Sequence, residues 1–511
     1  MGLRKDLRVW AMGWLALLAI FPNDLSAQPA TRKEKVKAAA GVVERIFSAH
    51  AAARHLPGLA WGVIYDGGLV ISGGCGLADL GQQRPATPQS LFRAASMSKS
   101  FTAMAILQLR DAGRLRLDDP AALYLPELKA LRPVTADAPE ITLRHLLTHG
   151  AGLPEDNPWG DRQLARTDAE LLALLPEISM ANAPGVAYEY SNLGFAILGQ
   201  IVQRVSGMDF TVYTRELIFK PLGMGSSIWE YAGAPPERLV RGYARSGASF
   251  TELPMEHHGA YGAMGGLITS VEDFARYAAF HLSAWPPRDE ADAVPLRRSS
   301  LREMHHPWRF YSLLPDADPA AGAPCPAAQA YAYGLRWQSD CGGMVAVGHS
   351  GGLPGFGSNW TMLPDYGIAV VSFTNLTYAT TTAINRTVLD TLIALAGLEP
   401  RQPPVSAILE KRKYELIGML PEWQGARESG IFAENFFLDN PPAELARLSR
   451  QLFAEAGEIR GAGPMRPLNN LRGSFLLEGS RKDISLFFTL TPERVPTIQE
   501  LKMTLVEKSG G

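Results

Sequence analysis

The sequence is poor in cysteine, carries no large excess of charge of either sign, and contains no long apolar run. Only 3 cysteines, Cys75, Cys325 and Cys341, occur in 511 residues, which excludes a disulfide-rich scaffold. A formal net charge of −2 excludes a general attraction to nucleic acid or to anionic membranes. We find no glycine-rich or Walker-type phosphate loop, so no nucleotide is indicated. A globular chain of two or three domains remains, and we expect it to act on a small molecule or a peptide.

The most apolar stretch lies at the N-terminus and is too short for a comfortable membrane span. It runs for 13 residues from Val9 to Phe21, after Arg4 and Arg8 and before Ala27. A basic segment, an apolar segment and small residues in that order predict a signal peptide over residues 1–27, cut after Ala27. We therefore expect a periplasmic or secreted protein with no membrane span after cleavage.

An oxidising compartment would permit a bridge between Cys325 and Cys341. A strand-like run from Tyr331 to Gln338 lies between them and would hold the two ends apart unless residues 326–330 fold back. The sequence leaves the bridged and the free state open.

The stretch around Ser96 is the first candidate for chemistry. The run from Phe101 to Leu107 is apolar except for one threonine, which predicts a buried helix with Ser96 at its start. A serine there commonly caps the helix, but Lys99 lies three residues on and shares its face. An ordinary lysine is neutral in only about 1 molecule in 2,500 at pH 7. Burial would lower the pKa of Lys99 and allow its amine to take the proton of Ser96.

Two further polar groups lie at the ends of apolar elements. Tyr190 and Asn192 occur where a loop enters an apolar helix, so a phenol could relay a proton and an amide could hold Lys99 and a substrate carbonyl. The alternative is that Asn192 caps the helix and Tyr190 is a half-buried loop residue. His349, Ser350, Gly351 and Gly352 follow a strand-like run, where glycines would let substrate approach free backbone N–H groups.

These motifs occur in the order Ser96-Met97-Ser98-Lys99, Tyr190-Ser191-Asn192 and His349-Ser350-Gly351. With them, residues 40–396 resemble the serine β-lactamase-like superfamily, most closely its class C β-lactamase, esterase and D-peptidase branch. The resemblance implies an antiparallel sheet flanked by helices, an all-helical lobe carrying Tyr190, and a site between them. It thus implies an α+β fold of the β-lactamase and transpeptidase type.

The resemblance also implies an acyl-enzyme formed on Ser96, with Lys99 and Tyr190 moving protons. The N–H groups of Ser96 and Gly352 would bind the oxyanion. His349 stands where the family commonly has lysine, and a neutral imidazole would grip a substrate carboxylate less well. Small esters or amides are therefore the expected substrates. A true β-lactamase or D,D-peptidase, and a sensor that is acylated once, stay open as alternatives.

No metal or other cofactor is expected. His145 and His149 are four residues apart and would share a helical face, but no third ligand has a supporting spacing. The oligomeric state is left open by the sequence.

A composition change near Glu399 to Pro404 predicts a Pro-rich linker over residues 397–410. It would separate a hydrolase domain, residues 28–396, from a small α+β module, residues 411–511. That module has no clustered acid, base and nucleophile, so we assign it to packing, substrate gating or partner binding.

Overall fold

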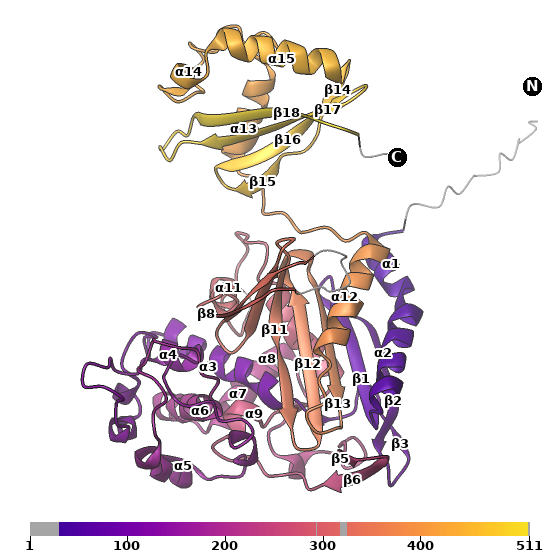
Figure 1. Cartoon of the computed structure of the whole chain (residues 1–511), viewed down its shortest axis with the longest axis vertical. Helices are drawn as coiled ribbons and strands as arrows, with labels where there is room; N and C mark the ends of the chain where they lie inside the picture. Colours follow the sequence, from indigo (N-terminus) through magenta and orange to yellow (C-terminus); the bar gives the residue numbers. More distant parts are fainter. Residues whose placement is uncertain (1–29, 293, 317–323, 509–511) are drawn as a thin grey trace, which may run out of the picture.

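The computed structural model describes residues 30–292, 294–316 and 324–508, so the predicted signal peptide lies outside the described residues. Its centre is a nine-stranded antiparallel sheet in the order β3-β2-β1-β13-β12-β11-β10-β9-β8 (Figure 1). The strands are β1 (Gly58–Tyr65), β2 (Gly68–Asp79), β3 (Arg84–Pro85), β8 (Arg309–Leu314), β9 (Ala327–Tyr331), β10 (Arg336–Asp340), β11 (Val345–Leu353), β12 (Phe356–Leu363) and β13 (Ile368–Thr374). Pairing of β1 with β13 joins the two ends of this part of the chain.

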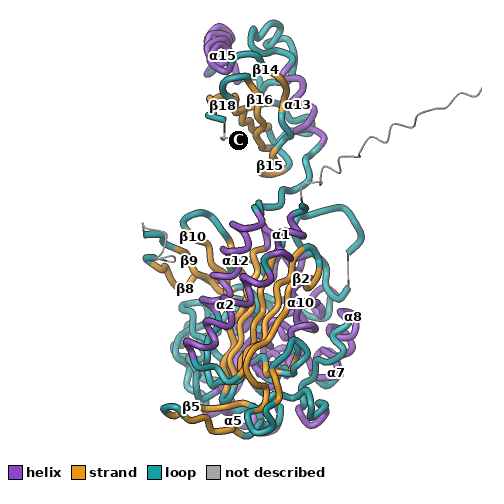
Figure 2. The backbone as a smooth tube through the Cα atoms, turned by 90° about the vertical axis from the view of Figure 1, so that its right-hand side faces the viewer, coloured by secondary structure: helices purple, strands orange, loops and turns teal. Residues whose placement is uncertain are grey.

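One face of the sheet is covered by helices from both ends of the same region (Figure 2). These are α1 (Arg32–Ala38), α2 (Ala40–Arg54) and α12 (Thr382–Ala396). Phe47 of α2 stacks on Trp61 of β1 with ring centroids 4.8 Å apart. Helices α1 and α2 are separated only by Ala39.

The other face packs against α10 (Val271–Leu282) and a helical lobe. The lobe contains α3 (Lys99–Asp111), α4 (Leu143–Leu147), α5 (Asp168–Leu174), α6 (Asn192–Ser206), α7 (Phe210–Thr214), α8 (Lys220–Leu222), α9 (Gly262–Gly265) and α11 (Arg298–Met304). Residues 99–107 of α3 are all buried, because α6 and α9 cover that helix. The predicted architecture, an antiparallel sheet flanked by helices with a helical lobe, is confirmed.

A second antiparallel sheet with its own apolar core follows in residues 407–508 and is drawn above the first part in Figure 1. Its elements are α13 (Ala407–Ile417), α14 (Phe436–Asp439), α15 (Pro442–Ala456), β14 (Ile459–Ala462), β15 (Arg466–Asn469), β16 (Arg472–Gly479), β17 (Asp483–Leu490) and β18 (Ile498–Val506). Helix α13 begins at Ala407, inside the stretch predicted as linker. Ser406 explains this start, because its side chain accepts a hydrogen bond from the N–H of Leu409.

The hairpin of β9 and β10 brings Cys325 and Cys341 together. Ala327 pairs with Asp340, so residues 326–330 fold back along the following strand. The two cysteines form a disulfide, with their Cα atoms 5.2 Å apart. Of the bridged and free states that the sequence leaves open, the structure has the bridged one. Within the described ranges, no helix combines the length and apolar character needed to cross a membrane.

Candidate active site

Ser96 lies on a tight turn, Ala95–Ser98, directly before α3. Ala95 has a φ of 51°, a left-handed conformation that costs about 1 to 3 kcal/mol and must be held by its surroundings. The Ser98 hydroxyl holds it by donating to the carbonyl of Ala95 at 2.7 Å and accepting the N–H of Leu267 at 3.1 Å. Ser96 itself faces Lys99, and its side chain does not cap α3.

The amine of Lys99 is completely buried beside three polar partners. Its Nζ lies 3.0 Å from Ser96 Oγ, 2.7 Å from Asn192 Oδ1 and 3.0 Å from the carbonyl oxygen of Met264. Burial lowers the pKa of Lys99 to about 7, while the carboxylates of Asp161 and Asp156 oppose that shift.

An ammonium group could donate to all three of these partners, so the lowered pKa of Lys99 is what favours the neutral amine. The neutral amine also fits them. It carries two hydrogens and one lone pair, whereas an ammonium group has three donors and no acceptor. Asn192 Oδ1 and the Met264 carbonyl can each accept one hydrogen, and the lone pair is then left for the hydroxyl of Ser96. The arrangement can therefore remove a proton from Ser96.

Tyr190 closes the other side of Ser96. Its side chain is only 6% exposed, its ring centroid lies 4.9 Å from Lys99 Nζ, and its hydroxyl is hydrogen-bonded to Ser96. Burial raises the pKa of Tyr190 far above that of an ordinary phenol. Tyr190 thus stays protonated at neutral pH, so Lys99 is the better base of the two.

Asn192 is the first residue of α6, and the neighbouring Ser191 is the cap. Its NH₂ group donates to Asn157 Oδ1 at 2.7 Å and to Asp161 Oδ1 at 3.3 Å. The two contacts orient the amide oxygen toward Lys99. The geometry thus contains the expected contact with Lys99, while the NH₂ group is engaged with protein rather than open to a substrate.

His349 lies on β11, with its ring centroid 6.1 Å from that of Tyr190. Burial lowers the pKa of its imidazole well below the usual value, which keeps the ring neutral. One ring nitrogen, Nε2, lies 2.9 Å from the hydroxyl of Tyr331, so its tyrosine partner is Tyr331 rather than Tyr190. Nδ1 lies 2.5 Å from the carbonyl oxygen of Ser350.

A cavity of about 460 Å³ lies over Ser96. Of the predicted site residues, Ser96, Tyr190, His349, Ser350 and Gly352 line it, while Lys99, Asn192 and Gly351 lie beneath. A Cβ atom on Gly351 would lie 2.4 Å from the carbonyl oxygen of Ala94. The missing side chain of Gly351 therefore lets β11 pack closely against the turn that carries Ser96.

The two histidines considered as zinc ligands each bind backbone instead. His145 Nδ1 accepts the N–H of Thr142 at 3.2 Å, and His149 Nδ1 accepts that of Ser191 at 3.0 Å. The ring of His149 also packs against Tyr190, with centroids 4.3 Å apart. No group of three or more potential metal ligands occurs in the part of the chain that the structure describes.

Three groups at the site were not predicted: the Met264 carbonyl, Asp161 and Arg336. A backbone carbonyl carries no sequence signal, and Asp161 lies in a single 3₁₀ turn, Gly160–Arg162, which has no apolar periodicity to predict it. Arg336 was detectable in principle, because it is the charged residue of the strand-like run from Tyr331 to Gln338.

Asp161 should set the pH at which Lys99 loses its proton. Burial raises the pKa of Asp161 to about 6, even though the charge of Lys99 pulls it down. Its anion in turn raises the pKa of Lys99. Asp161→Asn should therefore move the acidic limb of the kcat/KM profile to lower pH, by about one unit. Asp118→Asn, which removes a carboxylate paired with Arg144, should leave the limb in place, and a shift to higher pH in Asp161→Asn would contradict the coupling.

The chain resembles known proteins of one family over most of its length. Residues 43–395 match the family model described as Beta-lactamase. The chain is 26% identical over 328 residues to Protein flp of Staphylococcus aureus (strain COL), covering 63% of this chain and 61% of that protein. It is 27% identical over 345 residues to Unguisins hydrolase ungD' of Aspergillus campestris, covering 64% and 59%. The chain thus spans about three fifths of the length of these relatives.

A solved structure shares the fold. The octameric penicillin-binding protein homologue from Pyrococcus abyssi superposes with a TM-score of 0.56 at 21% identity, covering 92% of this chain and 96% of that one. The fold, the position of Ser96 beside Lys99 and the family match over most of the chain agree. The chain belongs to the beta-lactamase family, whose members are in general serine hydrolases.

Proposed function

We propose that this protein hydrolyses small esters or amides through an acyl-enzyme on Ser96. The observation that carries the proposal is the buried amine of Lys99, which lies 3.0 Å from Ser96 Oγ and has acceptors for both hydrogens of its neutral form. One relative is named as a hydrolase of unguisins, which also supports hydrolysis.

In the acylation step, neutral Lys99 takes the proton of Ser96 while Oγ attacks the substrate carbonyl carbon. The electron pair of the carbonyl moves to its oxygen, which would be held by the N–H groups of Ser96 and Gly352. Such donors typically lower a barrier by about 3 to 4 kcal/mol each. When the tetrahedral intermediate collapses, the leaving group takes a proton from Lys99, directly or through the Tyr190 hydroxyl, and the amine is neutral again.

Water then releases the acyl group by the same route in reverse. Lys99, directly or through Tyr190, accepts a proton from a water molecule that attacks the ester carbon of acylated Ser96. Ser96 Oγ leaves with that proton, and the acid product is released. The high pKa of Tyr190 favours its role as a relay over that of a free phenolate base.

The experiment is mass spectrometry of the intact protein during hydrolysis of a para-nitrophenyl ester. A transient mass increase equal to the acyl group, mapped to the peptide containing Ser96, together with steady product release, is the expected result. A permanent adduct would instead favour a sensor, and turnover without any adduct would contradict the acyl-enzyme. Nitrocefin turnover faster than ester turnover would favour a true β-lactamase or D,D-peptidase.

We also propose that the protein is secreted or periplasmic and that residues from about 407 onward form an accessory module. The disulfide between Cys325 and Cys341 supports an oxidising compartment. The separate apolar core of residues 409–498 supports a module that folds as a unit and acts in packing, gating or partner binding.

A further inference from the structure

A cavity of about 290 Å³ lies in the helical lobe, between the loop that joins α3 to α4 and the loop that precedes Tyr190. Residues 122–141 form most of its wall, and residues 180–184 form the rest. It has no lining residue in common with the cavity over Ser96. It is therefore a separate candidate for binding a small molecule.

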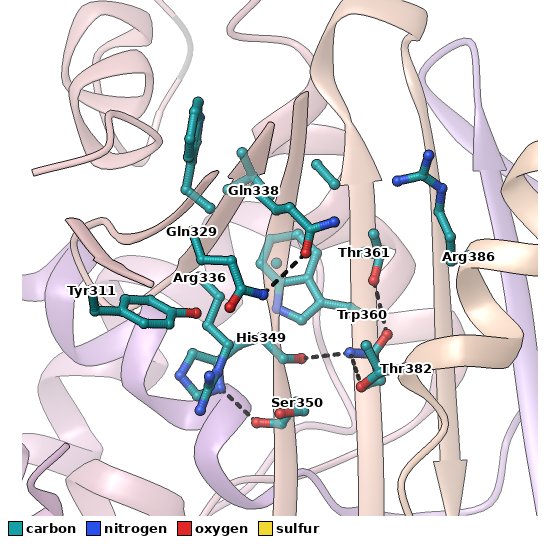
Figure 3. A pocket seen from close by; sticks show the side chains of 15 residues that line it. Tyr311, Gln329, Arg336, Gln338, His349, Ser350, Trp360, Thr361, Thr382 and Arg386 are labelled. Atoms are coloured by element: carbon teal, nitrogen blue, oxygen red, sulfur yellow. Dashed lines mark hydrogen bonds between the residues drawn. The ribbon is translucent and has the colours of Figure 1, made fainter. Parts of the chain in front are cut away.

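The hollow drawn in Figure 3 differs from this cavity in both respects. It continues the cavity over Ser96, because His349 and Ser350 line both. Its walls are largely polar, and Gln329 and Gln338 are joined across it by a hydrogen bond of 3.2 Å (Figure 3). That hollow therefore belongs to the active site already described.

The floor of the cavity in the lobe is an open part of the main apolar core. Leu128 is 6% exposed and belongs to that core, and three half-buried side chains pack against it, those of Leu131, Ile141 and Met180. Val134 also lines the cavity and is 50% exposed, so the cavity opens to water there. An apolar ligand part could thus leave water by extending the core outward.

The other lining residues with polar side chains are Asn182 and three charged residues. The amide of Asn182 donates to Glu189 Oε1 at 3.1 Å, so it is already engaged. Lys129, Arg132 and Glu140 are exposed, and none of the three forms an ion pair with another described residue. Two cations against one carboxylate leave an excess of one positive charge beside an apolar floor.

From these walls and charges we propose that the cavity binds a medium-chain fatty acid. The alkyl chain would lie against the apolar floor, and the carboxylate would lie at Lys129 and Arg132. Binding pockets are concave and mostly apolar, with a few polar groups that fix the orientation of the ligand. Lysine and arginine lay their apolar stems along such walls and keep their charged ends at the water side. This proposal does not depend on hydrolysis at Ser96.

The test is calorimetric titration of the delipidated full chain with butyrate, hexanoate, octanoate and decanoate. Each further methylene that enters the cavity should tighten binding by about 3- to 4-fold until the apolar floor is covered. Decanoate should bind about 10-fold more tightly than decylammonium, because the excess charge is positive. Added salt should narrow that difference.

Variants of the lining residues place the ligand. Lys129→Gln/Arg132→Gln should weaken decanoate binding by about 3- to 20-fold, since each exposed ion pair contributes little. Ala138→Trp puts a large ring into the cavity and should weaken binding of decanoate more than that of butyrate, with the melting temperature as a check on folding. Lys37→Gln removes an exposed lysine of α1 and should leave the affinity unchanged.

Affinities that do not grow with chain length, or equal affinities for decanoate and decylammonium, would overturn the proposal. So would an affinity that falls in Arg336→Gln but not in Lys129→Gln/Arg132→Gln, because the ligand would then lie in the cavity over Ser96, which Arg336 lines. Binding to phosphatidylglycerol vesicles without binding of free decanoate would indicate docking on a membrane and would overturn it as well.

Discussion

Ser96→Ala should lower kcat by about four to six orders of magnitude, because no other group near Lys99 can form the acyl-enzyme. Ser96 is the hydroxyl within 3.0 Å of the amine, and the Tyr190 phenol hydrogen-bonded to it has a raised pKa and stays protonated. The measurement is steady-state hydrolysis of a para-nitrophenyl ester, with the thermal melting temperature as a check on folding.

Ser100→Ala provides the matched control. Ser100 is buried in the first turn of α3, and its hydroxyl donates to the carbonyl of Met97 at 2.9 Å. Its loss should leave turnover within a few-fold of wild type. A Ser96→Ala protein that keeps most of its activity and its melting temperature would show that the chemistry takes place elsewhere.

Lys99→Ala should lower kcat by about two to four orders of magnitude, the usual contribution of a positioned base. The substitution also empties a buried site, so a small primary amine added to the solution could occupy it and restore part of the rate. We expect rescue by methylamine to grow with pH, because the neutral form of the amine is the active one.

Lys413→Ala separates loss of a base from loss of a buried lysine. Lys413 is also buried, but in the core of residues 409–498, where Glu410 lies 3.4 Å away. Its removal should destabilise that core without lowering kcat. If Lys99→Ala retains nearly full kcat, Lys99 is not the base.

The nucleophile and its base were predictable because they lie three residues apart where a buried helix begins. An apolar run after Ser96 predicts burial, and burial of an amine predicts a lowered pKa, as found for Lys99. The groups that tune this amine were not predictable in the same way. Asp161 and the Met264 carbonyl reach it from distant segments, and only the packing of α6 and α9 on α3 brings them close.

In the fold, too, elements set by local sequence were predictable, whereas contacts between distant segments were not. The turn residues Asp66 to Gly68 predict the hairpin of β1 and β2, and apolar runs predict β12 and β13. Pairing of β1 with β13, however, joins residues about 300 positions apart, and no local pattern specifies it. The disulfide depends on a much more local contact, because the turn between β9 and β10 brings Cys325 to Cys341 over a sequence separation of 16.

The pH dependence of Ser96 acylation tests the central claim most directly, namely that Lys99 is neutral at working pH. The rate of acyl-enzyme formation, measured by rapid mixing with a para-nitrophenyl ester, should rise with pH through a single group of pKa about 7 and then level off. A rate that keeps rising toward pH about 10, the region of an ordinary lysine, would contradict the account.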